Sequence, residues 1–112
     1  MNALPAPLND YFFVKSGVAF KKIHFQDILY LESALNYSTV YTADQKYMVR
    51  GNLKQVQDWL PEGHFIRIHK CFIVNKERIT SFNYSSVQIE GQEIPIGRRH
   101  KDNLFQEFKI AK

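Results

Sequence analysis

Three potential cations fall within four residues of an otherwise apolar run in the segment FIRIHKCFIVN, residues 65–75. Arg67, His69 and Lys70 interrupt Ile, Phe and Val side chains that would otherwise form an ordinary buried strand. The pattern leaves three interpretations open: a half-buried strand with one wet face, a catalytic histidine site, or a break in the strand that meets an acidic partner.

A second group of cations lies in GRRHKDN, residues 97–103. Its four basic side chains follow an expected strand and cross the start of the last expected helix: Arg98, Arg99, His100 and Lys101. Cations at a helix N-terminus oppose the helix dipole, at roughly 0.3–1 kcal/mol each. Backbone amides there suit a phosphate, and arginine can bind phosphate or the O6/N7 edge of guanine. The pattern favours a polyanion site over solvated side chains or ion pairs with Glu90 and Glu93.

A polar loop, SALNYS at residues 33–38, joins two expected strands and carries Asn36 and Tyr37. Asparagine can read adenine, and tyrosine can donate a hydrogen bond to a phosphate. Asparagine is also a common turn former at a strand junction, so the loop alone is weak evidence.

The sequence offers little for catalysis or metal binding. It contains no HExxH, no zinc-finger spacing of Cys and His, and no glycine-rich phosphate loop. His69 and Cys71 could form a nucleophile pair, but Cys71 as a small packing residue is the favoured interpretation. Asp27 and Glu32 are isolated carboxylates, better explained as a helix cap and a strand-edge charge. We expect no enzyme activity, no catalytic residue, no metal and no cofactor.

Length and composition indicate one globular domain of 112 residues with 45% hydrophobic content. A single cysteine excludes an internal disulfide and suggests a reducing cytosol. The chain has neither an apolar run of the roughly 18 residues that span a bilayer nor a signal-peptide core, so a soluble cytoplasmic protein is expected.

The net charge of +4 is unevenly distributed along the chain. Residues 1–62 hold six Lys/Arg and six Asp/Glu, whereas residues 63–112 hold nine and five. The whole excess therefore flanks the two basic segments. A modest excess is often only a matter of solubility, but this concentration favours a polyanionic partner.

Short apolar alternations between turn residues predict a mostly β domain built from hairpins, with two short helices. Expected strands cover residues 11–15, 18–25, 37–43, 46–50, 65–75, 78–85 and, as a hairpin, 86–97. Segment 27–35 is ambiguous over its first turn and is then expected to be a strand through 30–33. A helix over 53–60 has Asn52 as its cap and Pro61 at its end. A second helix ends the chain, with its apolar side chains facing the core: Leu104, Phe105, Phe108 and Ile110. Residues 1–10, which include two prolines, are expected to be a linker or domain boundary.

Four segments in series resemble the LytTR family of DNA-binding domains, typically the output half of bacterial response regulators. They are ILYLES, GNLKQVQDWL, FIRIHKCFIVNKERI and IPIGRRHKDNL, and the likeness covers about residues 11–109. The resemblance implies an elongated β-β-β sandwich of about ten strands in three small sheets. It also implies that loops, rather than a helix, enter successive major grooves on one side of duplex DNA.

Carried over from the family, the base-reading positions fall on Tyr37 with Asn36, on Lys70, and on Arg98. The resemblance implies supporting contacts, to phosphate or to the shape of a loop, from Arg67, His69, Arg99 and Lys101. Lys70 stands where the family often has Arg or Asn, and lysine is a less directional donor than arginine. Cys71 stands where the family usually has Ser, and it removes a hydroxyl donor from this position.

The resemblance further implies transcription regulation in a two-component system, with two copies on a direct repeat in promoter DNA. Dimerisation would come on DNA or through a receiver domain missing from this chain. We therefore expect a fragment of a longer regulator, with a stand-alone regulator as the alternative. An RNA-binding β-module, a small hydrolase and a protein-interaction module are the rival interpretations.

Overall fold

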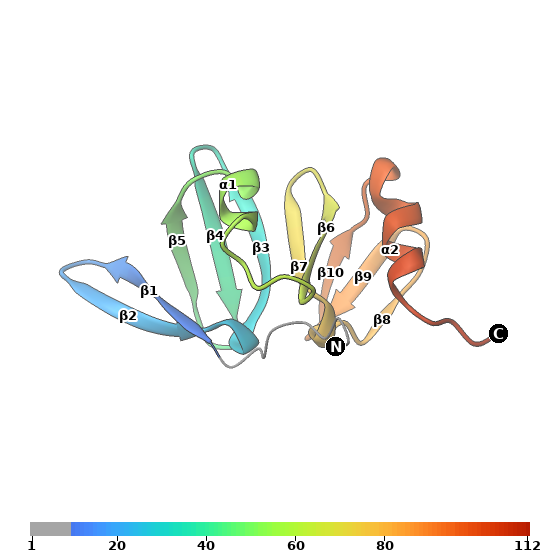
Figure 1. Ribbon diagram of the computed structural model, residues 1–112, viewed down its shortest axis with the longest axis horizontal. Helices are drawn as coiled ribbons and strands as arrows, with labels where there is room; N and C mark the ends of the chain where they lie inside the picture. Colours follow the sequence, from blue (N-terminus) through green and yellow to red (C-terminus); the bar gives the residue numbers. More distant parts are fainter. Residues whose placement is uncertain (1–9) are drawn as a thin grey trace, which may run out of the picture.

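The computed structural model describes residues 10–112, so most of the predicted linker, residues 1–9, lies outside the described part. Ten strands form three antiparallel sheets side by side along the longest axis of a molecule of 50 × 36 × 24 Å (Figure 1). The predicted fold class, mostly β and elongated with two short helices, is confirmed. The strands are β1 Tyr11–Ser16, β2 Ala19–His24, β3 Ile28–Ala34, β4 Tyr37–Thr42, β5 Lys46–Arg50, β6 Phe65–His69, β7 Phe72–Asn75, β8 Ser81–Phe82, β9 Ser86–Ile89 and β10 Gln92–Pro95.

The central sheet has five strands in the order β5-β4-β3-β7-β6. Antiparallel pairing puts Leu31 opposite both Val40 and Ile73, so these three side chains share one face. Tyr30, opposite Val74 and Tyr41, lies on the other face. Because both faces carry apolar side chains, the sheet needs cover on both sides.

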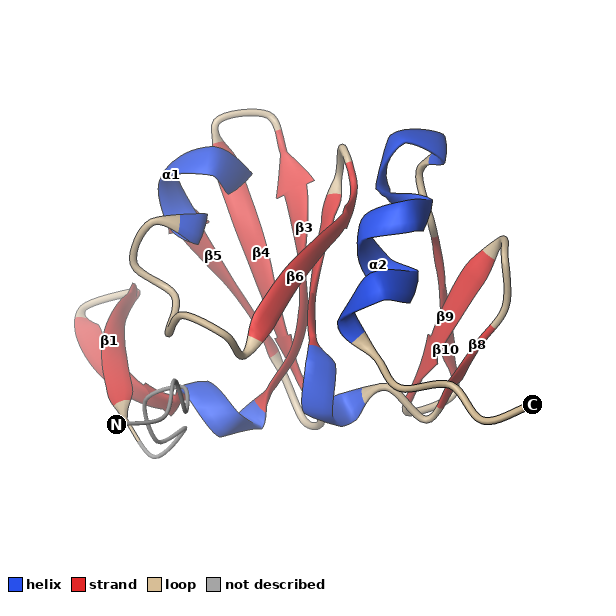
Figure 2. Cartoon of the chain, turned by 45° about the vertical axis from the view of Figure 1, so that its right-hand side comes forward, coloured by secondary structure: helices blue, strands red, loops and turns tan. Residues whose placement is uncertain are grey.

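Two hydrophobic clusters provide that cover. Cluster one joins Leu31, Val40 and Ile73 to residues of the β1–β2 hairpin and of α1, such as Val14 and Val56. Cluster two joins Tyr30 and Val74 to the three-stranded sheet β10-β9-β8 and to Leu104 of α2. Figure 2 shows α2 between β6 and this third sheet. The two ends of the molecule therefore pack on opposite faces of the same central sheet.

The first helix, α1 Leu53–Gln57, begins as predicted but ends three residues before the predicted limit. The Asn52 side chain accepts from the Gln55 N–H while the Gln55 side chain accepts from the Asn52 N–H, which completes a capping box. Beyond the helix, Trp59 packs on Phe12 and Phe25 at ring distances of 4.9 and 6.0 Å. Trp59 therefore serves the contact with the β1–β2 hairpin rather than a longer helix.

The C-terminal helix, α2 Lys101–Glu107, buries Leu104 fully, and Phe105 and Phe108 pack partly against cluster two. The predicted core position of Ile110 is wrong: this residue lies past the helix and is 48% exposed. No helix among residues 10–112 has the length and apolarity that crossing a membrane requires.

The predicted strand over 78–85 is also mostly wrong, because only Ser81 and Phe82 pair with β9. A single helical turn, η2 Lys76–Arg78, precedes them, and the Asn83 side chain then accepts from the backbone N–H groups of Ser85 and Ser86. This side chain turns the backbone directly into β9.

Candidate nucleic-acid interface

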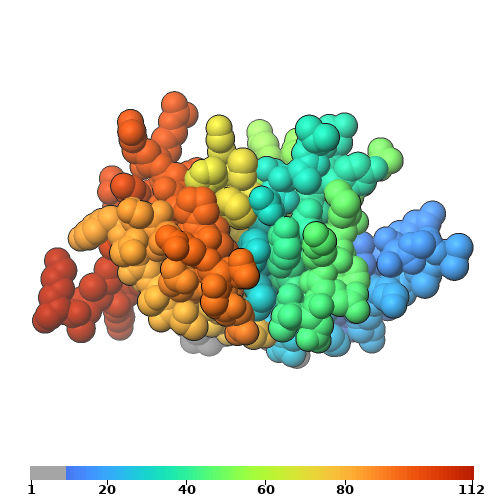
Figure 3. Space-filling model, turned by 180° about the vertical axis from the view of Figure 1, so that it is seen from behind, coloured from blue at the N-terminus to red at the C-terminus, as the bar shows by residue number. Residues whose placement is uncertain are grey.

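Three connections between elements lie along one long edge of the molecule, at the top of Figure 1. They are the β3–β4 turn at residues 35–36, the β6–β7 turn at 70–71, and the segment 97–100 that joins β10 to α2. We call them together the connector edge. From behind, side chains from these three parts of the chain project from the same edge (Figure 3). The sequence-predicted site residues are therefore brought together on one side.

Backbone hydrogen bonds hold the connections in fixed relative positions. The Ser33 N–H at the end of β3 donates to the Cys71 carbonyl at 2.9 Å, and the Gly97 N–H donates to the Ile68 carbonyl at 2.7 Å. The Gly51 N–H donates to the Asn36 carbonyl at 2.8 Å, which joins the start of α1 to the β3–β4 turn. Each connection is tied to a neighbouring strand or turn, so the edge is preorganised.

The β6–β7 turn is shaped by its own polar side chains. The Arg67 guanidinium donates to the carbonyl oxygens of His69, at 3.2 Å, and Lys70, at 2.6 Å. The Cys71 N–H donates to His69 Nδ1 at 3.0 Å. Lys70 alone of the trio is exposed, whereas Arg67 and His69 are half-buried. Of the three basic side chains, Arg67 and His69 therefore form hydrogen bonds that shape the turn, and Lys70 projects from it.

The segment 97–100 forms a short 3₁₀ turn, η3 Arg98–His100, immediately before α2. Arg98 and Arg99 are exposed, while His100 and Lys101 are half-buried. The alternative of ion pairs with Glu90 and Glu93 is wrong: the ion pairs found within residues 10–112 join His64 to Glu77, Lys76 to Glu107 and Arg78 to Asp27. The two arginines are thus free to meet an anion.

His100 sits where segment 97–100 packs on the β6–β7 turn. Burial lowers the pKa of its imidazole, and the neighbouring Arg67 and His69 charges lower it further. A backbone hydrogen bond with Arg67 acts in the opposite direction without reversing the shift. His100 is therefore a neutral spacer beneath the exposed arginines at neutral pH.

The β3–β4 turn presents Asn36 and Tyr37, both exposed, together with two residues that the sequence did not single out. Leu35 is 96% exposed and adopts a φ of 57°, a conformation uncommon for a residue other than glycine. Arg50, at the end of β5, pairs with Tyr37 across the sheet, and its guanidinium lies 5.6 Å from the centre of the Tyr37 ring. The sequence could have indicated Leu35, because it is an apolar residue inside a polar loop. Arg50 could not be found in this way, because only the pairing of β4 with β5 places it beside Tyr37.

The arrangement suits binding rather than catalysis. His69 Nδ1 accepts from the backbone of Cys71, so this ring nitrogen is already engaged in shaping the turn. Within residues 10–112, no three His, Cys, Asp or Glu side chains lie close enough together to hold a metal ion. What the edge offers instead is a row of exposed Arg and Lys side chains on a rigid support.

Comparison with known proteins identifies similar chains. Residues 19–109 match the family described as the LytTr DNA-binding domain. The sensory transduction protein LytT of Bacillus subtilis is 33% identical over 70% of this chain, and the transcriptional regulatory protein LytR of Staphylococcus aureus is 30% identical over 80%. These matches span only 35% and 39% of the two relatives' own lengths.

A solved LytTr DNA-binding domain of a Bacillus cereus response regulator shares the fold, with a TM-score of 0.77. The similarity covers 89% of this chain and 97% of that domain, at 20% sequence identity. The overall fold therefore has a solved counterpart, although few residues are identical.

Proposed function

The chain belongs to the LytTR family of DNA-binding domains, a family without enzymatic activity, and we propose that its connector edge reads duplex DNA sequence-specifically. One observation carries this proposal: exposed Lys70, Arg98 and Arg99 lie along a single edge, and none of them forms an ion pair within residues 10–112. Separate projections along one side of a molecule whose longest extent is 50 Å fit successive major grooves on one side of B-form DNA better than one compact pocket would. We take residues 11–112 as the whole DNA-binding unit.

Base contacts come from the outermost side chains of the three connections. Arg98 is suited to the O6/N7 edge of guanine and Asn36 to adenine, while Lys70 and Tyr37 complete the set. Leu35, apolar and exposed beside Asn36, suits the methyl group of thymine.

Supporting contacts divide into two kinds. Arg67 and His69 act on DNA through the shape of the β6–β7 turn, because their polar atoms are engaged in it. Arg99 and Lys101 contact phosphates, and Arg50, beside Tyr37, joins them. Phosphate contacts of this kind position the protein without selecting a sequence.

The domain serves as the output half of a two-component transcriptional response regulator in the bacterial cytoplasm. The similarity to LytT and LytR supports this role, as does a match confined to about two-fifths or less of their lengths. Two copies bind a direct repeat in promoter DNA, and a receiver domain supplied by a longer chain controls their pairing. An RNA-binding module, the rival interpretation, predicts instead a preference for single strands in competition.

Alanine substitutions test the interface once selection from a random duplex pool has supplied the target sequence. Arg98→Ala should cost about 1–3 kcal/mol on the target while leaving affinity for random duplex less affected. Lys70→Ala should likewise lose affinity for the target. Arg99→Ala should weaken both kinds of duplex and reduce the slope of log affinity against log salt by about 1.

Lys109→Ala is the matched control, because it removes an exposed positive charge beyond the end of α2, away from the connector edge. It should leave the preference for the target unchanged. If Lys70→Ala and Arg98→Ala bind target and random duplex as the parent protein does, the proposed interface is wrong.

A further inference from the structure

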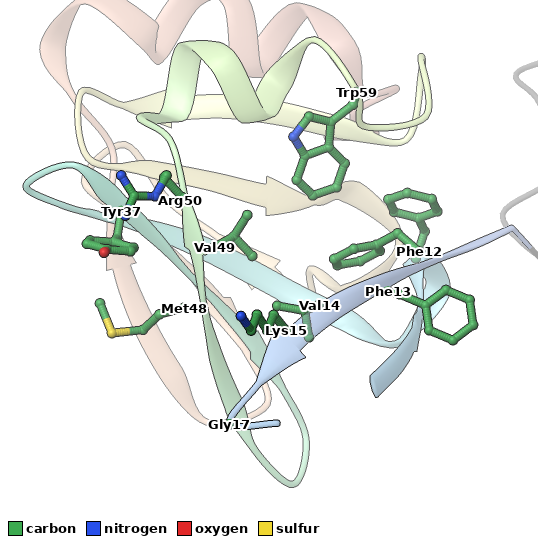
Figure 4. Close-up of a pocket in the computed structure, with 11 residues that line it drawn as sticks. Phe12, Phe13, Val14, Lys15, Gly17, Tyr37, Met48, Val49, Arg50 and Trp59 are labelled. Atoms are coloured by element: carbon green, nitrogen blue, oxygen red, sulfur yellow. The ribbon is translucent and has the colours of Figure 1, made fainter. Parts of the chain in front are cut away.

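An open groove of about 750 Å³ lies between the β1–β2 hairpin and the β5–α1 end of the central sheet. We call it the arm groove (Figure 4). Its volume falls within the roughly 300–1,000 Å³ typical of small-molecule sites. Phe12, Phe25 and Trp59 form its aromatic wall, and Met48 and Tyr37 lie on the opposite side.

Part of the aromatic wall is exposed to solvent. Phe12 stacks on Phe25 at 5.1 Å and tilts against Trp59 at 4.9 Å, so the three rings already form a rigid unit. Trp59 nevertheless remains 38% exposed, and Met48 across the groove 54%. Flat, rigid apolar surface of this kind binds a planar or aliphatic group at little cost in conformational entropy.

The charge around the groove has one sign. Lys15 and Arg50 line it, and no carboxylate does. Neither cation takes part in the ion pairs found among residues 10–112. Figure 4 shows the indole nitrogen of Trp59, a further hydrogen-bond donor, on the side of its ring that faces Arg50. Donors and cations at an apolar wall are complementary to a ligand with one apolar body and one anionic head.

We propose that the arm groove binds a small amphipathic organic anion and that its occupancy weakens DNA binding. The apolar body of the ligand lies on Phe12 and Trp59, and its carboxylate or sulfonate meets Arg50 and Lys15. The ligand class follows from the lining: an uncharged ligand leaves both cations unpaired, and a purely polar anion leaves the aromatic wall uncovered.

The effect on DNA rests on the proposed function, through two shared residues. Tyr37 lines the arm groove and, as the first residue of β4, directly follows the β3–β4 turn, and Arg50 lies over its ring. An anion paired with Arg50 neutralises a cation beside the connector edge and places negative charge close to the proposed path of the DNA phosphates. The negative charges of the ligand and of the DNA backbone repel each other, so the ligand and DNA compete.

Binding is tested on the intact chain with anilinonaphthalene sulfonate as the probe and phenylnaphthylamine as its uncharged counterpart. Trp59 is the only tryptophan, so quenching of its fluorescence reports the approach of the probe, and the substitutions at the groove assign its position. Arg50→Gln should weaken sulfonate binding about fivefold, the upper range for a partly exposed ion pair, and leave the uncharged compound unaffected. Met48→Glu, at an exposed position, should weaken the sulfonate in the same direction.

Lys22→Gln is the control, because Lys22 is an exposed cation of the same hairpin outside the arm groove. It should leave both titrations unchanged. Absence of Trp59 quenching overturns the site, as do equal sulfonate titrations in Arg50→Gln, Met48→Glu and Lys22→Gln.

The second arm of the test measures affinity for target duplex with and without saturating probe. A several-fold loss supports the competition, whereas unchanged affinity at saturation overturns it. The two proposals fail separately: a protein that binds no DNA without the probe contradicts the DNA interface, while the Trp59 titration, done without DNA, still decides the groove.

Discussion

Arg67 and Lys70 illustrate how similar charges take different tasks three residues apart. The guanidinium of Arg67 reaches two carbonyl oxygens of its own turn, which a flat fork of donors can do and a lysine ammonium cannot do equally well. Lys70 has its carbonyl bound in this way and its side chain left outside. Sequence reasoning held a break in the strand as one of three interpretations, but which cation turns inward depends on the path of the turn.

His100 gives a pH prediction. Its pKa is lowered in the native protein, first by burial and then by the charges of Arg67 and His69. Below the usual value of about 6.5, the unfolded chain binds a proton that the native protein takes up only at lower pH. The free energy of unfolding should therefore be highest above that pH and fall as the pH drops through it.

Urea unfolding at pH 7.5 and 5.5 measures this effect, with His100→Gln as the comparison. The substitution should reduce the loss of stability on acidification, because glutamine does not titrate. Equal pH dependence in the parent and the variant would contradict a lowered pKa at His100.

At the scale of elements, Gly97 brings the segment before η3 close to His69 at the end of β6. A Cβ atom at Gly97 would lie 3.2 Å from His100 Cδ2 and 3.3 Å from His69 Cα, and the latter is backbone that cannot swing away. Gly97→Ala should therefore lower the free energy of unfolding by about 1–3 kcal/mol, the range for overpacking. It should also weaken binding to target DNA, since Lys70 and Arg98 would shift relative to each other.

Urea unfolding and duplex titration check both effects, with Gln92→Ala on the exposed side of β10 as the control. That variant should behave as the parent does. Wild-type stability and wild-type selectivity in Gly97→Ala would mean that the two connections adjust independently.

Most elements were predictable from the chain because hairpin strands and their turns are specified locally. Alternation marked the strands from β1 to β7, and Asn52 marked the start of α1. The length of β8 was not predictable, since it depends on how many residues of β9 are free to pair with it. The early end of α1 has the same kind of cause: Trp59 is engaged by Phe12, a residue 47 positions away in the chain.

At the scale of the whole molecule, two hydrophobic clusters share one central sheet. Leu104 is fully buried in cluster two, and Trp59 contacts Phe12 and Phe25 of cluster one. If the sheet couples the two clusters, a cavity at one end should destabilise the other. Leu104→Ala should lower the free energy of unfolding by about 2–5 kcal/mol, and the urea midpoint read from Trp59 fluorescence should fall together with that read from circular dichroism.

Ile110→Ala is the matched control, because it removes apolar atoms from a largely exposed side chain in the same C-terminal segment. Its midpoint should stay close to that of the parent. An unchanged urea midpoint of Trp59 fluorescence in Leu104→Ala would show that the two ends unfold independently.

The separation of the connector edge from both clusters has a consequence for how such regulators diversify. Leu35, Asn36, Lys70 and Arg98 are exposed at the ends of hairpins and at a helix start, and none belongs to either cluster. With the DNA interface proposed above, mutations that change the DNA target sequence can therefore accumulate there at little cost in folding free energy. Gene duplicates could acquire distinct regulons while inheriting an unaltered scaffold.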